Sequence, residues 1–138
     1  MVQHMARTTP LAIQISVGDA RPIVRQITDA VRLMISTGEA EQGDVLPSVR
    51  GLAQQLGVNP NTVAKAYAEL TTEGWLESRQ GLGLFVAPRR QRLSRGERLR
   101  RFDEAVQRFV VEVVPLQFSV DEIHARIDLE MRSLKKQA

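Results

Sequence analysis

Apolar residues recur with a helical spacing near the start of the chain, after a short alternating segment. Residues 11–17 alternate apolar and polar side chains, which predicts a short strand or an extended arm. The next apolar residues follow one another at steps of four, which places them on one face of a helix. Pro22 can open this helix because its missing N–H would be unpaired there, and Gly38 is expected to end it. The residues of this stripe are Ile23, Ile27, Val31 and Ile35.

Two shorter helices are predicted next, joined by a turn at residues 57–59. Ser48 can cap the first of them. Asn59 and Pro60 form a strong start signal for the second helix. An asparagine side chain at the N-cap accepts a hydrogen bond from a backbone N–H of the first turn, and proline at the first helical position has no N–H that would stay unpaired. Gly74 is expected to end this second helix. The core-facing residues of the two helices are predicted to be Leu52, Ala53, Leu56, Val63, Ala66, Tyr67 and Leu70.

The periodicity changes again after these helices. Residues 75–79 and 84–86 flank a glycine-rich tip, which predicts a β-hairpin. Two Ser-x-x-Glu sequences further on, at Ser94 and Ser119, fit the capping box that opens helices. Each begins a long segment with near-heptad apolar spacing, and the two segments together predict an antiparallel helical hairpin. The apolar seams consist of Leu99, Phe102, Val106, Phe109, Val113 and Leu116 in the first helix and Val120, Ile123, Ile127, Met131 and Leu134 in the second.

These elements predict a mainly α-helical fold with a small β-wing. Residues 11–88 would form a winged helix-turn-helix domain, in which two short helices meet at a tight turn and a β-hairpin follows. Residues 89–138 would form a linker and an antiparallel two-helix tail, which we expect to be a dimerisation element. Residues 1–10 would be an N-terminal arm or a remnant of cloning.

The composition fits one globular domain with an appendage. The chain has 138 residues, of which 43% are hydrophobic and 25% charged. It has no cysteine, which excludes disulfides, thiolate nucleophiles and cysteine zinc sites. No apolar run reaches the roughly 18 residues that a membrane helix needs. We therefore expect a cytoplasmic protein without a membrane partner.

No constellation of catalytic, metal-binding or cofactor-binding residues is visible in the sequence. A Ser/His/Asp set, paired acids in a cleft and a phosphate loop are all missing, so we expect neither an enzyme nor a bound cofactor. Gly81 and Gly83 lack the third glycine and the following helix of a dinucleotide site. His124 and Asp128 lie one helical turn apart, but two ligands are too few for a metal site, and a solvated helix face explains them better.

The basic excess of the chain lies in one short stretch. Residues 89–101 contain seven arginines and one glutamate, whereas the segments on either side are slightly acidic. These arginines can contact a polyanion, pair with acidic residues of the tail, or remain solvated. Cations in the first turn of a helix oppose its dipole, which mildly favours an external anion. The sequence leaves all three roles open.

The exposed face of the helix that begins at Pro60 carries side chains that suit DNA. If its apolar residues face inward, then Asn61, Thr62 and Lys65 face outward near its N-terminal end, the end that enters the major groove in helix-turn-helix proteins. Asparagine pairs with adenine, threonine reaches a phosphate or a thymine methyl, and lysine reaches guanine or phosphate. The alternative is a winged-helix module that binds another protein, because similar helical corners occur in proteins that do not contact DNA.

Several short sequences agree with a known family in spacing and residue type, from the turn before the first short helix to the wing. Over residues 20–87 the chain resembles the GntR family of bacterial transcription regulators. The short helical tail resembles that of the YtrA-like subfamily, which dimerises and is too small for a conventional ligand domain. The sequences that carry the resemblance are Leu46–Arg50, Leu52–Val63, Tyr67–Leu70, Glu73–Glu77, Arg79–Gly81 and Phe85–Val86.

The resemblance implies three DNA contacts at matching positions. The family's DNA-contacting arginine after Leu-Pro-Ser matches Arg50, and its threonine near the start of the recognition helix matches Thr62. Its wing-tip glycine, whose backbone approaches the minor groove, matches Gly81.

The chain departs from the family at two positions. Pro60 and Ala64 stand where the family often has arginine. We expect Asn61 and Lys65 to take over part of the base readout, so the operator should differ from those of relatives that carry the arginines.

The remaining candidate residues lie around the turn and the wing. A wing in a minor groove needs a cation beside its glycine, which favours a DNA contact for Arg79, although Arg79 and Gln80 could instead solubilise the hairpin and Arg50 could form a surface ion pair. Tyr67 is expected in the core with its hydroxyl in water, and Trp75 as a core plug beneath the wing. The full candidate DNA-binding set is Ser48, Arg50, Asn59, Asn61, Thr62, Lys65, Arg79, Gln80 and Gly81.

The two tail helices carry more apolar surface than one thin appendage can bury. We expect them to associate with a second copy around a two-fold axis, rather than to pack back on the winged domain. The function expected is therefore a homodimeric regulator of double-stranded DNA, a repressor at a palindromic operator, and the resemblance implies a transport-related operon. The sequence does not identify a small-molecule effector. The expected dimer interface consists of Phe102, Val106, Phe109, Val113, Ile123, Ile127 and Met131.

Overall fold

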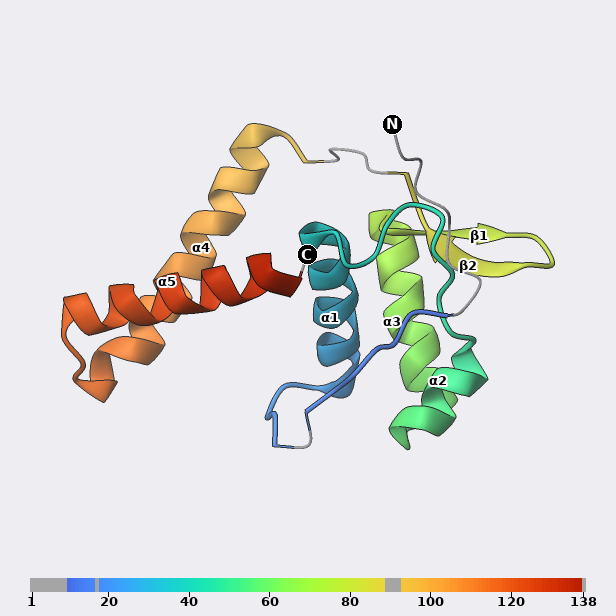
Figure 1. Cartoon of the computed structure of the whole chain (residues 1–138), viewed down its shortest axis with the longest axis horizontal. Helices are drawn as coiled ribbons and strands as arrows, with labels where there is room; N and C mark the ends of the chain where they lie inside the picture. The colour runs from blue at the N-terminus through green and yellow to red at the C-terminus, as the bar shows by residue number, and fades with distance from the viewer. Residues whose placement is uncertain (1–9, 17, 89–92, 138) are drawn as a thin grey trace. The chain divides into compact units, whose positions relative to one another are not determined.

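The computed structural model of the chain contains two compact units (Figure 1). The structure describes residues 10–16, 18–88 and 93–137. The first unit spans Met1–Arg89 and contains three helices and a β-hairpin. The second unit spans Arg90–Gln137 and contains two helices joined by a short 3₁₀ turn. The predicted fold class, mainly α-helical with a small β-wing, is confirmed.

Helix α1 (Ile23–Thr37) begins and ends as the sequence predicts. Pro22 occupies the N-cap position, and the helix ends at Gly38, whose φ of 84° is a left-handed conformation that suits glycine. The predicted stripe is buried except at its first residue, because Ile23 lies at the edge of the unit and is exposed.

The two short helices are α2 (Val49–Leu56) and α3 (Pro60–Glu73). The predicted caps are present. The Ser48 hydroxyl accepts a hydrogen bond from the Gly51 N–H at 3.0 Å, and the Asn59 side chain accepts one from the Asn61 N–H at 2.8 Å. Side-chain oxygens thus pair N–H groups that a helix start leaves without partners.

The wing is an antiparallel hairpin of β1 (Leu76–Arg79) and β2 (Gly83–Val86). Leu76 pairs with Val86 at its base, and both side chains are buried. The segment before α2 extends the sheet, because the Leu46 N–H donates to the Leu84 carbonyl at 2.9 Å. The base of the wing is therefore held by the core, and its tip projects from the unit (Figure 1).

The core of the first unit lies where α1, α2 and β1 all pack against α3. The arm before α1 completes it: Leu11 and Ile13 are buried, and the Leu11 N–H donates to the Val45 carbonyl at 3.0 Å. The arm is extended but is not a regular strand. Inward residues of the two short helices match the prediction, with Leu56 only half-buried.

Two aromatic residues differ from expectation. The Tyr67 hydroxyl is not in water, because it is buried and donates a hydrogen bond of 2.8 Å to the Pro47 carbonyl. Trp75 is half-buried at the edge of the core, and its indole N–H donates to Glu73 at 3.1 Å. The Tyr67 hydroxyl and the Trp75 indole N–H each need a hydrogen-bond partner when they are buried or half-buried. Each finds an acceptor within the first unit.

The second unit consists of α4 (Arg95–Val113), the 3₁₀ turn η1 (Val114–Leu116) and α5 (Val120–Gln137). Both predicted serine caps are present. The hydroxyl of Ser94 accepts from the Glu97 N–H and that of Ser119 from the Glu122 N–H, each at 3.1 Å. The bend thus lies where the sequence places it.

The apolar seams of the tail do not close on each other within one chain. Helices α4 and α5 run in clearly different directions (Figure 1), and they do not pack along their lengths. Of the described side chains in α4, only Glu97 and Val113 are even half-buried, and in α5 only Ile123 and Leu134. The antiparallel packing expected of the tail is therefore absent from the single chain, and its apolar residues face solvent.

Candidate nucleic-acid interface

The N-terminal end of α3 presents a short polar face to solvent. Asn61 and Lys65 are exposed and lie one helical turn apart, and Thr62 beside them is half-buried. Ala64 is also exposed and is small enough to let another molecule approach the helix closely. The side-chain oxygen of Asn59 is already engaged in capping the helix, so a DNA contact from this residue would use its amide N–H groups.

The start of α2 adds a cation and a hydroxyl near the helix-turn-helix. Arg50 lies in the first turn and is exposed, with no ion pair to any described residue. The Ser48 hydroxyl serves as the cap of α2 and remains exposed. Both residues thus lie where a phosphate at the helix N-terminus would be favoured by the helix dipole and free N–H groups.

The cation of the wing is held by its neighbours. The guanidinium of Arg79 lies over the Phe85 ring, 4.2 Å from its centroid. The same group donates to the Glu77 carboxylate through Nε and Nη2, at 3.3 and 3.2 Å. Glu77 thus competes with any external anion for Arg79, a relationship that the sequence pattern did not reveal. Alternate residues of a strand share a face, so the two-residue spacing of Glu77 and Arg79 is the sequence signal that could have predicted this pair.

The tip of the wing is mostly backbone. Gly81 and Gly83 have φ values of 75° and 107°, which other residues rarely adopt. A Cβ atom at either position would meet nothing within 4 Å, so the backbone conformation rather than space calls for glycine. Gln80 is exposed beside them. Between the two glycines stands Leu82, an exposed apolar residue that sequence reasoning did not include in the site.

An ion-pair network ties the far end of α3 to α1 and the wing. Arg32 of α1 donates to both carboxylate oxygens of Glu73, at 2.7 and 3.0 Å, and also pairs with Asp29. Glu73 in turn accepts the indole N–H of Trp75 just before β1. Partly exposed pairs contribute little stability, so the network mainly fixes orientation. Arg32 and Glu73 are far apart in sequence, which is why no local pattern predicted their contact.

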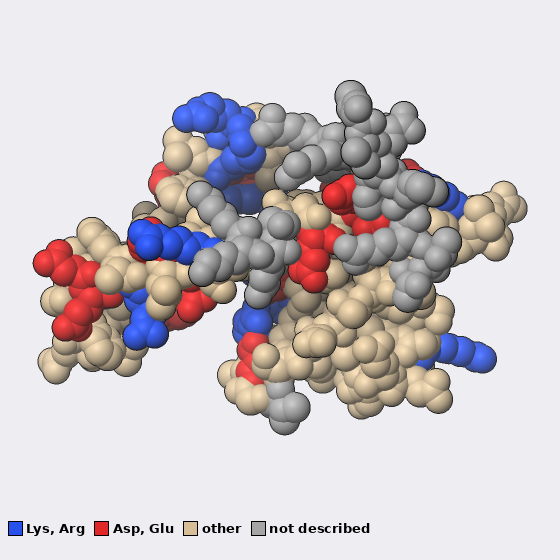
Figure 2. Space-filling view, viewed as in Figure 1, with Lys and Arg blue, Asp and Glu red and all other residues tan. Residues whose placement is uncertain are grey.

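On the face of the first unit that Figure 2 shows, basic side chains of the described residues do not gather in one patch. In Figure 2 the described surface over α2, α3 and the wing is mostly neutral, with basic side chains at separate places. Scattered cations suit contacts with a few defined phosphates. Long-range electrostatic attraction would instead require many charges of one sign gathered together.

The arginine-rich stretch divides into parts with different surroundings. Arg89, Arg90 and Arg92 lie outside the described residues. Arg100 pairs with Glu97 and Glu104, and Arg101 pairs with Glu97, so these two arginines are engaged within α4. Hydrogen bonds from Arg100, and then from Arg101, lower the pKa of the Glu97 carboxyl to about 2. Of the three roles open to these arginines, pairing with acidic residues of the tail is therefore the one seen for Arg100 and Arg101, at the C-terminal end of the stretch.

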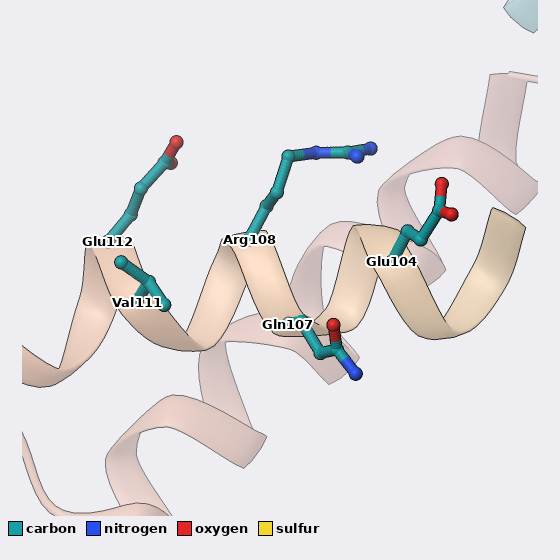
Figure 3. A pocket seen from close by; sticks show the side chains of 5 residues that line it. All are labelled: Glu104, Gln107, Arg108, Val111 and Glu112. Atoms are coloured by element: carbon teal, nitrogen blue, oxygen red, sulfur yellow. The ribbon is translucent and has the colours of Figure 1, made fainter.

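The tail offers little that could hold a small molecule or a metal. A surface hollow runs along α4 and is lined by five side chains of this one helix, so it encloses nothing (Figure 3). Within the described residues no group of three potential ligands could hold a metal ion. Asp128 pairs with Arg132 at 2.7 Å rather than with His124. The residues of the hollow are Glu104, Gln107, Arg108, Val111 and Glu112.

No described helix is both long enough and apolar enough to cross a lipid bilayer.

A helix-turn-helix followed by a β-hairpin, with polar side chains exposed at the start of its second helix, defines the winged helix-turn-helix class. Residues 23–86 match the model of the bacterial regulatory proteins of the gntR family. The chain is also 30% identical to the HTH-type transcriptional repressor YtrA of Bacillus subtilis, over 81% of this chain and 86% of that protein. The chain belongs to the GntR family, and it is a transcription regulator with a winged-helix DNA-binding domain.

Two further comparisons extend the likeness into the tail. The uncharacterised HTH-type regulator YhcF of Bacillus subtilis is 34% identical over 75% of this chain and 85% of its own. The crystal structure of a transcriptional antiterminator from Listeria monocytogenes has a TM-score of 0.77 at 28% identity, and it covers 92% of this chain and 95% of its own. These relatives are regulators rather than enzymes.

Proposed function

We propose that the chain is a homodimeric repressor that acts in the cytoplasm at a palindromic operator. In this proposal residues 11–88 bind double-stranded DNA, and residues 89–138 link this domain to a dimerisation tail. Transcription falls because an occupied operator blocks RNA polymerase. The repressor role is proposed from the similarity to the transcriptional repressor YtrA, and the link to a transport-related operon from the family resemblance.

The observation that carries the proposal is the unpartnered apolar surface of the tail. Phe102 is 64% exposed and Phe109 is 39% exposed, and other large apolar residues share the same helices. Burying one such side chain fully contributes about 1.5–3 kcal/mol. Covering this seam with another apolar surface would therefore stabilise the tail helices. The exposed seam residues are Leu99, Phe102, Val106, Phe109, Leu116, Val120, Ile127 and Met131.

A second copy of the same tail is the partner that fits best. Two copies related by a two-fold axis present identical seams to each other, so each apolar residue meets an apolar neighbour. The half-buried Val113 and Ile123 near the bend would continue the interface toward the 3₁₀ turn. A two-fold dimer carries two recognition helices, and their symmetry requires two half-sites in inverted orientation.

The residues of the first unit would divide between bases and phosphates. Asn61 and Lys65 stand on the exposed end of α3 and would read base edges in the major groove. Arg50 and Thr62 would contact phosphates and so hold the register. Wing contacts would come from Arg79, with the adjacent Gln80 and Gly81. Ser48 and Asn59 would contact DNA in addition to capping α2 and α3.

The proposal is tested by selecting binding sites for the full chain from random duplexes. We expect enrichment of an inverted repeat whose half-sites lie about one helical turn apart or a multiple of it. As a control, a combined Asn61→Ala and Lys65→Ala variant should enrich a different or weaker motif. Recovery of unenriched duplexes by the wild-type protein would contradict the proposal and favour a winged-helix module that binds protein.

A further inference from the structure

The tip of the wing carries one large apolar side chain in open solvent. Leu82 is 70% exposed. It follows Gly81 and precedes Gly83, so no side chain stands on either side of it. The turn itself is fixed, because the Leu82 N–H donates to the Arg79 carbonyl at 2.9 Å.

The fold of the wing does not need this residue. The wing contacts the core through Leu76, Leu84 and Val86, which share one face of the hairpin. Leu82 lies beyond the last paired residues, Arg79 and Gly83, and takes no part in that packing. Single exposed apolar residues are common on protein surfaces. The place of Leu82 therefore matters more than its exposure, since it lies with Gln80 and Gly81 in the unpaired tip of an element that would approach DNA.

A narrow apolar tip has a definite preference in the minor groove. The minor groove is about 6 Å wide, which admits a thin backbone turn with one side chain. Every base pair presents acceptor atoms on the floor of this groove, and a G·C pair adds the N2 amino group of guanine, which an A·T pair lacks. An isobutyl group cannot accept a hydrogen bond from that amino group and would bury it without a partner. Apolar side chains that enter the minor groove are known to act as wedges.

We propose that Leu82 contacts the floor of the minor groove and selects against G·C pairs beneath the wing. The inference rests on the proposed operator binding and adds a determinant of specificity that is distinct from α3. Arg79 does not occupy the tip. Its guanidinium is held over Phe85, so the cation stays along the flank of the wing while Leu82 occupies the tip.

The test uses the selected operator with G·C or inosine·C placed at successive pairs of one half-site. These two pairs differ only in the N2 amino group of the minor groove, so comparing them isolates that group. For the wild-type chain we expect G·C beneath the wing to weaken binding about fivefold or more relative to inosine·C, within the range of a single unfavourable pair. For Leu82→Ser we expect the ratio to fall below about twofold, because the hydroxyl can accept from the amino group.

Leu33→Ser is the matched control, since Leu33 is an exposed leucine of α1 in the same unit. This variant should keep the wild-type ratio. A Leu82→Ser variant that keeps the full ratio would overturn the inference. An equal loss on both duplexes would also overturn it, because Leu82 would then contribute affinity without selectivity, as would be the case if the residue served a protein partner. Failure of the wild-type chain to bind any selected duplex would instead contradict the proposed function itself.

Discussion

The hydroxyl of Tyr67 donates a buried hydrogen bond of 2.8 Å to the carbonyl oxygen of Pro47. This bond joins the middle of α3 to the turn that precedes α2. Tyr67 lies on the core face of the helix, whereas Asn61 and Lys65 lie on its exposed face. The bond therefore helps to fix the angle at which α3 presents its exposed end, without taking part in DNA contact.

Tyr67→Phe should lower the free energy of unfolding by about 1–3 kcal/mol, because it leaves the Pro47 carbonyl buried without its partner. Chemical denaturation followed by circular dichroism measures the change. Thr71→Val, which removes a part-buried hydroxyl that donates to the Tyr67 backbone carbonyl within the same helix, is a suitable control and should change stability less. Equal stability of Tyr67→Phe and the wild type would mean that the hydrogen bond contributes nothing net.

The same residue predicts a dependence of stability on alkaline pH. Burial raises the pKa of the Tyr67 hydroxyl above its ordinary value of 10.0. The folded chain thus keeps this proton at a pH where the unfolded chain releases it, so the free energy of unfolding falls as pH rises above about 10. Tyr67→Phe should lack this part of the loss. Denaturation curves for both proteins between pH 8 and about 11 should therefore converge, and parallel curves would contradict the shift.

The dimer interface can be broken by charge. Replacing Phe109 and Ile127 together with aspartate should give monomers, since each aspartate would be buried at the interface without a partner. Analytical ultracentrifugation measures the mass, and operator binding should weaken severely because only one half-site is engaged at a time. Val111→Asp is the matched control, because Val111 lies on α4 outside the predicted seam, and it should remain dimeric. A dimeric double variant would place the interface elsewhere.

Base and phosphate contacts should respond differently to alanine. Asn61→Ala and Lys65→Ala should each cost about 1–3 kcal/mol at particular base pairs and relax the preference there. Arg50→Ala and Thr62→Ala should weaken binding evenly across sequences. Site selection followed by sequencing distinguishes the two patterns. A motif for Asn61→Ala that is identical to that of the wild type would remove Asn61 from the readout.

The arginine stretch should separate into two halves under salt. Changing Arg89, Arg90 and Arg92 together to glutamine should flatten the slope of log affinity against log salt by about one to three units, since each neutralised phosphate adds about 0.9. Arg100 and Arg101 are the control pair, because both are engaged with Glu97. Their replacement by glutamine should leave the slope nearly unchanged. An unaltered slope in the first variant would assign those arginines to solvent or to pairing within the chain.

Local signals predicted most of the winged unit. Ser48, Asn59 and Gly38 carry their capping or terminating roles in their own chemistry, and the structure shows each in place. The inward positions of Val63 and Leu70 predicted which residues of α3 are exposed, because residues on the opposite face of a helix point away from the core. Such features depend on residues a few positions apart, which is the range over which sequence patterns are informative.

What the sequence did not predict depends on contacts between distant segments or on surfaces without a partner. Tyr67 and Pro47 lie 20 positions apart, and the buried bond between them requires the folded corner. The pairing of Arg32 with Glu73 joins residues 41 positions apart, so it also requires the folded unit. The tail helices have a regular apolar pattern, but the pattern does not state what covers it, and a single chain leaves it exposed.

The central claim is that two chains bind one operator through their tails. The most direct test is the mass of the complex between the full-length chain and a short duplex that holds one inverted repeat, measured by sedimentation or native mass spectrometry at micromolar concentration. We expect two chains for each duplex, and a dimer of the protein alone. A complex with one chain for each duplex, or a protein that is monomeric alone at that concentration, would contradict the account.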